Sequence, residues 1–400
     1  MANRPEIVFL SGVRTGFGSF GGTLKELSAT DLGVIAAKAA IERAGVTADS
    51  VDHVVVGNAM QTSADGAYIA RHIALRAGCS IPTPALTVNR LCGSGFEAIV
   101  QGAQQILLGE SRVVLAAGAE SMSQAPHVAR GLRWGVKLGA SPQLEDLLWQ
   151  GLTDAYCGCP MGVTAENLAK KYGIPRAEVD AFALRSQQAA KTAWESGWFS
   201  DELCPIPITN RKTKQPEPWA ADEHMRPETT AEGLARLAPV FSKEGVVTAG
   251  NASGIADGAA ACIVASGEFA KERGLAPIGK LVAWGVAGVE PEIMGIGPAP
   301  AARQALTRAG MTLDQMDRVE VNEAFAAQYL AVEKELGLDR QRTNVEGGAV
   351  AIGHPLGASG TRITVHLLHT LRRIGKRYGL GSACIGGGQG IAVIVEAFGS

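Results

Sequence analysis

Arg43-Ala44-Gly45-Val46-Thr47 recurs 265 residues further along the chain as Arg308-Ala309-Gly310-Met311-Thr312. The match starts at Ala36 and continues as far as Ala59 in the first copy. Each copy predicts an amphipathic helix, a turn at Ala-Gly and a short apolar strand. A repeat this long indicates two copies of a larger unit and not a solenoid of small repeats.

The part of the unit that follows this match also recurs in kind. A helix is predicted from Cys92 to Gly109 and is followed by the apolar strand 112–118, and a helix predicted from Ser359 to Arg373 is followed by the strand 381–385. Strands that alternate with helices indicate α/β units. Two such units facing each other predict an α/β protein with a five-layered α/β/α/β/α arrangement.

Residues 122–251 break this pattern and contain five of the six tryptophans. Helices are predicted at 165–172 and 175–196, and the Pro-rich run 205–227 is expected to be an extended loop. We interpret 122–251 as an inserted loop domain that covers a site. The predicted division is an N-terminal half at 1–121 completed by about 252–275, the loop domain at 122–251, and a C-terminal half at 276–400.

The composition restricts the class of protein. A formal net charge of −2 over 400 residues gives no bulk attraction to nucleic acid or to an anionic membrane. No apolar run is long enough to span a bilayer, and the first residues carry no secretory pattern. We expect a cytoplasmic protein.

The seven cysteines are an odd number in a long chain, which argues against a disulfide framework. Cys157 and Cys159 form a CxC pair with no second pair at ligand spacing, so no metal site is predicted. We interpret these two residues as ordinary packed or loop thiols.

Two reactive side chains stand in glycine-rich segments. Cys92 lies at a predicted helix start, where the helix dipole would lower the pKa of its thiol and the amides could hold an oxyanion. Gly93 and Gly95 would leave room for a substrate. His354, within Gly353-His354-Pro355-Leu356-Gly357, could be the base that activates the thiol. The alternatives are a buried structural cysteine and a solvated loop histidine.

Two more polar side chains follow predicted strands. Cys384 precedes Gly386-Gly387-Gly388, whose amides could face a ligand, and Asn322 follows the strand 319–321. Core packing is the alternative for Cys384. Ser359 is interpreted as a helix cap.

Together the segments 89–95, 322–325, 347–360 and 384–390 resemble the motifs of thiolases, the family of acetyl-CoA acetyltransferases and 3-ketoacyl-CoA thiolases. The resemblance covers Glu6 to Phe398. It implies a duplicated thiolase fold with an inserted loop domain, an acyltransferase, and an acyl-cysteine intermediate.

The resemblance also implies a role for each reactive group. Cys92 would be the nucleophile that carries the acyl group, and His354 would deprotonate it. Cys384 would be the acid and base at the α-carbon of acetyl-CoA. Asn322 would orient a water that completes one oxyanion hole with His354, and the amides of Cys92 and Gly386 would form a second.

The same resemblance implies substrate contacts. Ser253 would lie against the pantetheine of CoA, and Arg226 would contact its nucleotide. The acyl pocket would be lined by Met161, Met294, Ala324 and Phe325. Simple core packing is the alternative for the pocket positions and for Ser253. The basic run 211–214 is interpreted as a solvated face.

Pro160 is a departure that bears on the substrate. Acetoacetyl-CoA thiolases of biosynthesis typically have a histidine at this position, so we favour a broad-range 3-ketoacyl-CoA thiolase of fatty-acid β-oxidation, with acetoacetyl-CoA thiolase as the alternative. A decarboxylating ketoacyl synthase would carry a histidine in place of Asn322, and a non-catalytic CoA or lipid carrier would lack a catalytic residue. The expected partners are acyl-CoA, acetyl-CoA and CoA, with no cofactor, no metal, no nucleic acid and no membrane, in a homodimer or homotetramer.

Overall fold

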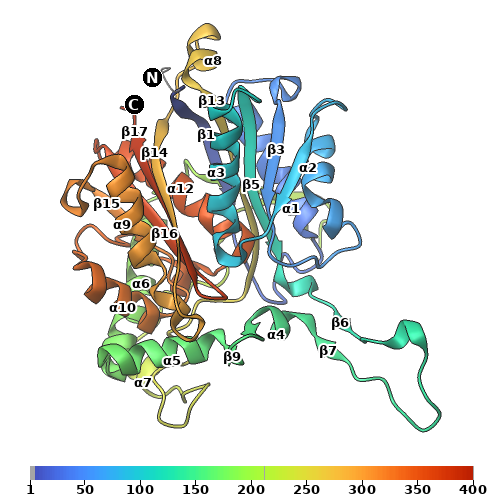
Figure 1. The fold of residues 1–400 in the computed structure, drawn as a ribbon, viewed down its shortest axis with the longest axis vertical. Helices are drawn as coiled ribbons and strands as arrows, with labels where there is room; N and C mark the ends of the chain where they lie inside the picture. Colours follow the sequence, from blue (N-terminus) through green and yellow to red (C-terminus); the bar gives the residue numbers. More distant parts are fainter. Residues whose placement is uncertain (1–4, 211, 400) are drawn as a thin grey trace.

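The computed structural model describes residues 5–210 and 212–399 (Figure 1). Its main sheet has the strand order β15-β16-β17-β14-β1-β13-β5-β3-β4. The N-terminal half contributes β1 (Ile7–Thr15), β3 (His53–Gly57), β4 (Ala85–Val88), β5 (Val113–Ser121) and β13 (Ala256–Ser266), with helices α1 (Ala29–Arg43), α2 (Ile69–Ala77), α3 (Ser94–Leu107) and α8 (Gly267–Glu272).

The C-terminal half repeats this arrangement. It contributes β14 (Gly279–Gly288), β15 (Arg318–Val321), β16 (Tyr378–Ile385) and β17 (Gln389–Ala397), with helices α9 (Pro298–Ala309), α10 (Ala326–Leu336), α11 (Ala349–Ile352) and α12 (Leu356–Arg373). In each half a parallel pair, β3 with β5 or β15 with β16, continues into antiparallel neighbours. The halves meet where β1 pairs with β14, at Val8 opposite Lys280 and Phe9 opposite Gly279.

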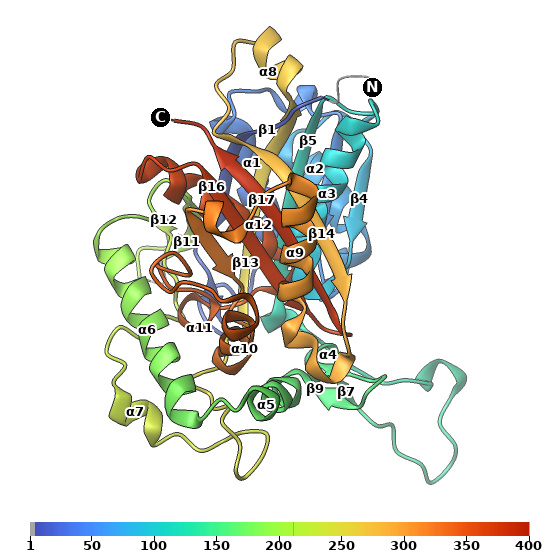
Figure 2. The same ribbon diagram turned by 60° about the vertical axis from the view of Figure 1, so that its left-hand side comes forward.

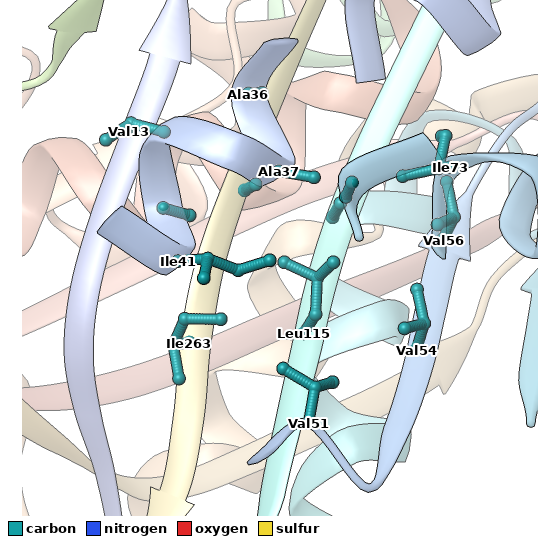
Figure 3. Packing of buried hydrophobic residues seen from close by; sticks show 14 of the residues in the cluster. Val13, Ala36, Ala37, Ile41, Val51, Val54, Val56, Ile73, Leu115 and Ile263 are labelled. Atoms are coloured by element: carbon teal, nitrogen blue, oxygen red, sulfur yellow. The ribbon is translucent and has the colours of Figure 1, made fainter. Parts of the chain in front are cut away.

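The alternation of side chains along β5 shows how the layers form. Leu115 and Ala117 point into a core beneath α1 and α2, together with Val54, Ile73 and Ile263 (Figure 3). Their neighbours Val114 and Ala116 point to the opposite face, into a core shared with α3 and α12. Period-two alternation with both faces apolar is typical of a strand covered on both sides.

A third core lies on the outer face of the C-terminal half. It contains Val319 and Val321 of β15 and Leu330 of α10. Helices α3 and α12 therefore lie between the two halves, while α1 and α2 cover one outer face and α9 and α10 the other (Figures 1 and 2). The prediction of a duplicated, five-layered α/β fold is confirmed.

The two central helices approach each other through glycines. A Cβ on Gly95 of α3 would lie 2.5 Å from the Thr361 amide nitrogen of α12, and one on Gly360 would lie 2.2 Å from the Phe96 nitrogen. A Cβ on Gly93 would lie 2.7 Å from Ile385. The expectation that Gly93 and Gly95 make room for a substrate is therefore wrong, because they make room for protein atoms.

Residues 122–251 add four helices and several short strands below the sheet. The helices are α4 (Leu147–Gly151), α5 (Met161–Tyr172), α6 (Arg176–Glu195) and α7 (Ala231–Ala235), and the short strands are β6 (His127–Val128), β7 (Glu145–Asp146), β8 (Thr153–Asp154), β9 (Cys159–Pro160), β10 (Leu203–Cys204), β11 (Ile206–Thr209) and β12 (Pro216–Trp219). The run 205–227, expected to be loop, contains the hairpin of β11 and β12. These two strands have four residues each, too few to be visible as a sequence period, which accounts for this difference.

An extended arm leaves the body between β6 and β7 (Figure 1). Its apolar side chains are exposed, with Trp134 at 86% and Leu132 at 46%. We call residues 129–144 the arm. The rest of the region is tied to the sheet, because β10 pairs with β1 at Arg14 and Leu203. In the described part of the chain, no helix is long and apolar enough to cross a membrane.

A buried cluster of charges joins these parts. Arg14 of β1 is fully buried and binds Glu202 at 2.6 Å and Asp222 at 2.7 Å, both from the region after α6. Glu202 also contacts His366 of α12 at 2.8 Å. Removing one partner of a buried ion pair is strongly destabilising, because the other charge is left buried without compensation. The cluster therefore fixes the central helix against β1 and against the loop region.

Candidate active site

Cys92 lies in a strained turn before α3. A short 3₁₀ turn spans Leu91–Gly93, and Leu91 has a φ of +45°, a left-handed value that is unfavourable for a leucine. The hydroxyl of Ser94 accepts from the Arg90 amide and donates to the Leu91 carbonyl, which closes the turn. The helix itself begins at Ser94, two residues later than predicted.

The Cys92 thiol is enclosed, and this determines its protonation. Burial raises the pKa of Cys92 to about 12, and hydrogen bonds from the Gly386 and Cys92 amides oppose the shift only in part. The expectation of a lowered pKa is wrong for the free protein, because the helix begins beyond the thiol and desolvation dominates. Both amides nevertheless point at the sulfur, as the second predicted oxyanion hole requires.

His354 is held in one tautomer by its neighbours. The Ser359 hydroxyl donates to the Pro355 carbonyl at 3.0 Å, so His354 Nδ1 donates to that hydroxyl, at 2.5 Å. The lone pair on Nε2 then accepts from Asn322 Nδ2 at 3.2 Å. Burial, together with the charge of Arg362, lowers the pKa of His354 to about 3, so the ring is neutral.

The histidine and the first cysteine share one neighbourhood. Cys92 packs against a cluster that contains Met60, Met122 and Leu356, and Leu356 lies two residues after His354. A protonated thiol in the same neighbourhood as a neutral imidazole, whose unprotonated Nε2 accepts from Asn322, is the resting state of a thiol–base pair. Proton transfer then accompanies attack on a substrate and does not precede it.

Cys384 is the last residue but one of β16 and is fully buried. Burial, followed by the nearby Cys92 sulfur, raises the pKa of Cys384 well above its ordinary value. Its cluster contains Met294 and Ala324, with Met161 and Phe325 packed against them. The structure thus brings four predicted pocket residues around the second thiol.

Asn322 follows β15 directly and is 1% exposed. The backbone N–H of Asn322 donates to the Ser382 carbonyl at 2.8 Å, which fixes the residue beside β16. Among the described residues, Asn322 Oδ1 finds no hydrogen-bond partner. A buried oxygen without a protein partner is a place for an ordered water.

A cavity of about 430 Å³ opens next to these groups, and of the predicted catalytic residues His354 is in its wall. It reaches His354 and is lined by Ser253, whose amide donates to the Ala324 carbonyl at 3.0 Å. Most of the remaining wall is apolar: Phe20, Leu148, Trp149, Pro160, Met161, Phe241 and Phe325. An apolar cavity with a few polar groups at its end is typical of a small-molecule site.

Arg226 lies outside this cavity. It lines a neighbouring cavity of about 380 Å³ with His224 and Gln187, and its guanidinium donates to the Glu223 carbonyl at 2.9 Å. The two cavities share Ala249 in their walls, and Gly254 of the first lies so close to His224 of the second that a Cβ on it would be 2.5 Å from the ring. Of the basic run 211–214, residues 212–214 are exposed and Arg211 lies outside the described residues.

Two family models match the chain. The thiolase N-terminal domain matches residues 7–268 and the thiolase C-terminal domain residues 275–397. The chain belongs to the thiolase family. Thiolases are acyltransferases, and this chain is an enzyme of that class.

Individual relatives are similar along their whole length. Human mitochondrial 3-ketoacyl-CoA thiolase is 55% identical over 391 residues, which are 98% of each chain. An acetyl-CoA acetyltransferase of Chromobacterium violaceum is 47% identical over 98% of this thiolase and 99% of that protein. The crystal structure of the human enzyme in complex with CoA superposes with a TM-score of 0.96, at 54% identity and 98% coverage of both chains.

These comparisons contradict one expectation. The sequence was expected to be that of a cytoplasmic protein, yet the relatives of highest identity reported above are named as mitochondrial. Composition and the absence of a secretory pattern do not distinguish two compartments that both hold reduced, soluble enzymes. The cytoplasmic assignment is therefore wrong.

Sequence analysis missed residues that position this thiolase's site. Ser359 is not a helix cap, since it lies inside α12 and bonds His354. Glu120 accepts hydrogen bonds from the Ala59 and Gly357 amides and so joins the two halves next to the site. Glu323 follows Asn322 in the motif, and that adjacency was the available signal: it accepts from Ser186 of α6 at 2.6 Å.

Proposed function

We propose that this thiolase is a broad-range 3-ketoacyl-CoA thiolase of fatty-acid β-oxidation: a 3-ketoacyl-CoA and CoA give a shortened acyl-CoA and acetyl-CoA, reversibly. The observation that carries the proposal is the apolar wall formed by Pro160, Met161 and Phe325 in the cavity that ends at His354. Such a wall suits acyl chains longer than that of acetoacetyl-CoA.

In the direction of cleavage, Cys92 Sγ attacks the C3 carbonyl carbon while its proton passes to His354 Nε2. The C2–C3 bond then breaks, and its electron pair forms the enolate of acetyl-CoA, which takes a proton from Cys384. A CoA thiol next gives its proton to the Cys384 thiolate and attacks the acyl thioester on Cys92. The Cys92 sulfur leaves and recovers its proton from His354, so every group returns to its first state.

Two sets of donors stabilise the charges that form in these steps. A water held by Asn322 Oδ1, together with protonated His354, would face the enolate oxygen. The amides of Cys92 and Gly386, which already point at the nucleophilic sulfur, would face the tetrahedral oxyanion. Fixed donors in a site closed to bulk water are worth several kcal/mol, about 2.7–4 per donor in measured cases.

Binding of CoA would use both cavities. We place the pantetheine along Ser253 and the nucleotide near Arg226, with residues 122–251 as the inserted loop domain over them and 1–121 with about 252–275, and 276–400, as the two halves. The existence of a CoA complex of the human relative supports the binding of CoA. We propose no cofactor, because CoA is a substrate and product.

The alternative is a thiolase restricted to acetoacetyl-CoA. The acetyl-CoA acetyltransferase of Chromobacterium violaceum is 47% identical, less than the 55% of the human 3-ketoacyl-CoA thiolase. The test is kcat/KM over a chain-length series for the wild type and Pro160→His. We expect 3-ketohexanoyl-CoA and longer substrates to lie within about tenfold of acetoacetyl-CoA, a difference of about 1.4 kcal/mol.

A collapse of wild-type activity beyond four carbons would favour the alternative, since each methylene in an apolar pocket is worth about 1–3 kcal/mol. Pro160→His should narrow the range and leave acetoacetyl-CoA cleavage nearly intact. Mass spectrometry after mixing with acetyl-CoA should find the acetyl group on the peptide that contains Cys92. An adduct on Cys384 alone would reverse the two roles.

We also propose that the chain forms a homodimer or homotetramer. The support is the arm, which extends away from the body in Figure 1 and exposes Leu132, Trp134 and Leu138. Exposed apolar clusters of this kind mark interaction sites, and a second copy of the chain is the occupant we expect. Analytical ultracentrifugation of Trp134→Ser/Leu138→Ser should show a smaller assembly than the wild type. An unchanged assembly would exclude the arm as the interface.

A further inference from the structure

Cys157 and Cys159 belong to a tight hairpin that leads directly into Pro160 and Met161, two residues of the cavity wall. Strands β8 and β9 pair at Thr153 opposite Pro160 and Asp154 opposite Cys159, so the residues between them form the turn. Gly158 has a φ of +69°, and nothing lies within 4 Å of where its Cβ would be. A left-handed helical backbone at Gly158 keeps the Cα atoms of Cys157 and Cys159 about 5.5 Å apart. This separation is within the range that a disulfide spans.

The side chain of each of these two cysteines contacts the other cysteine. Cys159 Sγ is 3.6 Å from the Cys157 carbonyl oxygen. Burial raises the pKa of the Cys157 thiol, a hydrogen bond from the Cys159 amide opposes this, and the Cys159 thiol adds to it. The Cys157 sulfur is thus approached by both the amide and the thiol of Cys159. Two thiols in this relation need only a side-chain rotation to be joined.

Accessibility sets this pair apart from the structural cysteines. Cys92, Cys157 and Cys159 are partly exposed, whereas Cys79, Cys204, Cys262 and Cys384 are buried. Because Cys92 is the proposed nucleophile, Cys157 and Cys159 are the two partly exposed thiols that the mechanism does not use. In the described ranges no third side chain completes a set of metal ligands with the pair. The neighbouring Tyr156 is 88% exposed, so a solute reaches the turn from solvent.

We propose that Cys157 and Cys159 form a reversible disulfide that acts on the acyl cavity through Pro160 and Met161. The oxidant is a hydroperoxide. One thiolate attacks the terminal peroxide oxygen and the O–O bond breaks. An alcohol or water is released, and the attacking cysteine becomes a sulfenic acid. The second thiol attacks that sulfur, the S–O bond breaks, and water leaves. Two thiols and one hydroperoxide thus give a disulfide, one alcohol or water, and one water; a dithiol reverses the change.

The connection to the cavity is direct. Pro160 follows Cys159, is paired in β9, and lines the cavity. Met161 follows in turn: its amide donates to the Leu152 carbonyl at 2.9 Å and its side chain packs against the cluster of Cys384. A ring closed across Gly158 restricts the motion of the turn that carries these two wall residues. This effect on substrates rests on the proposed function, whereas formation of the disulfide does not.

The experiment uses the full chain with Cys92 acetylated by acetyl-CoA during oxidation, which protects the nucleophile. One equivalent of hydrogen peroxide is added, free thiols are alkylated, and peptides are mapped by mass spectrometry. We expect the peptide with Cys157 and Cys159 to lose two hydrogens and both alkylation sites, and dithiothreitol to restore them. Gly158→Ala, which disfavours the left-handed turn, should form the disulfide at least fivefold more slowly.

The functional readout is the ratio of kcat/KM for 3-ketooctanoyl-CoA to that for acetoacetyl-CoA. We expect oxidation to lower this ratio at least threefold in the wild type and to leave it unchanged in Cys157→Ser/Cys159→Ser. Retention of both alkylation sites while other cysteines oxidise, or a single over-oxidised cysteine, would overturn the disulfide. A disulfide with an unchanged ratio would overturn the effect on the cavity. If neither redox form cleaves the longer substrate, the broad-range function fails while the disulfide stands.

Discussion

Ser359→Ala tests whether the orientation of His354 limits catalysis. The substitution removes the oxygen that His354 Nδ1 contacts at 2.5 Å and leaves a buried N–H without a partner, at a cost of about 1–3 kcal/mol. The ring is 5% exposed, so water does not readily replace the hydroxyl. If the ring relieves this cost by moving its proton to Nε2, it loses the lone pair that takes the proton from Cys92. We expect kcat/KM for thiolysis to fall by about 5- to 150-fold.

The assay needs a control for the loss of a buried hydroxyl as such. Thr364→Val provides one, because Thr364 lies in the same helix, is fully buried, and donates to the Gly360 carbonyl at 2.9 Å without touching His354. In urea, Ser359→Ala should lose about 1–3 kcal/mol of unfolding free energy and Thr364→Val about 1 kcal/mol. Only Ser359→Ala should slow acetylation of Cys92 in a single turnover. Activity of Ser359→Ala within twofold of wild type, or an equal loss in Thr364→Val, would refute the reasoning.

Three further outcomes are expected. Cys384→Ser should still be acetylated by acetyl-CoA but should not make or break carbon–carbon bonds, because a hydroxyl exchanges protons poorly near neutral pH; parallel loss of both steps would contradict this. Burial alone would lower the pKa of His366, but the charge of Glu202 raises it overall, so its stabilising contribution is complete below about pH 6.5 and is lost as pH rises through the folded-state value. His366→Gln should therefore destabilise more at pH 6 than at pH 9 in urea titrations, and the reverse order would be inconsistent with the ion pair. Gly95→Ala, whose Cβ would lie 2.5 Å from a backbone nitrogen, should cost about 1–3 kcal/mol or more, whereas Gly288→Ala, with no atom closer than 4.0 Å, should cost little.

The repeat could be predicted from the sequence because each copy places apolar residues at helical and strand spacing. The pairs β3 and β15, and β5 and β16, keep the same offset of 265 residues in the structure. The local periodicity of apolar residues is enough to predict the two copies of the unit, and the packing of the cores does not change the positions of these strands.

What could not be predicted depends on contacts between distant segments. The raised pKa of Cys92 comes from burial by residues of both halves, and the role of Ser359 comes from a histidine five residues away whose ring is placed by the fold. Gly95 packs against α12, 266 residues further on. Spacing along the chain contains none of these distances. From the sequence alone, a glycine beside a nucleophile therefore predicts room for a substrate and not a contact between helices.

The position of β1 has a consequence for how the protein is made. Its nine buried residues pair with β10, β13 and β14, and β13 begins only at Ala256. At roughly 5–20 residues per second, a ribosome needs on the order of tens of seconds to supply those partners. Throughout that time β1 has unpaired edges, a condition under which nascent chains aggregate. The N-terminal half therefore cannot complete its sheet until the later strands have been translated. We expect residues 1–121, when made alone, to require a chaperone to stay in solution.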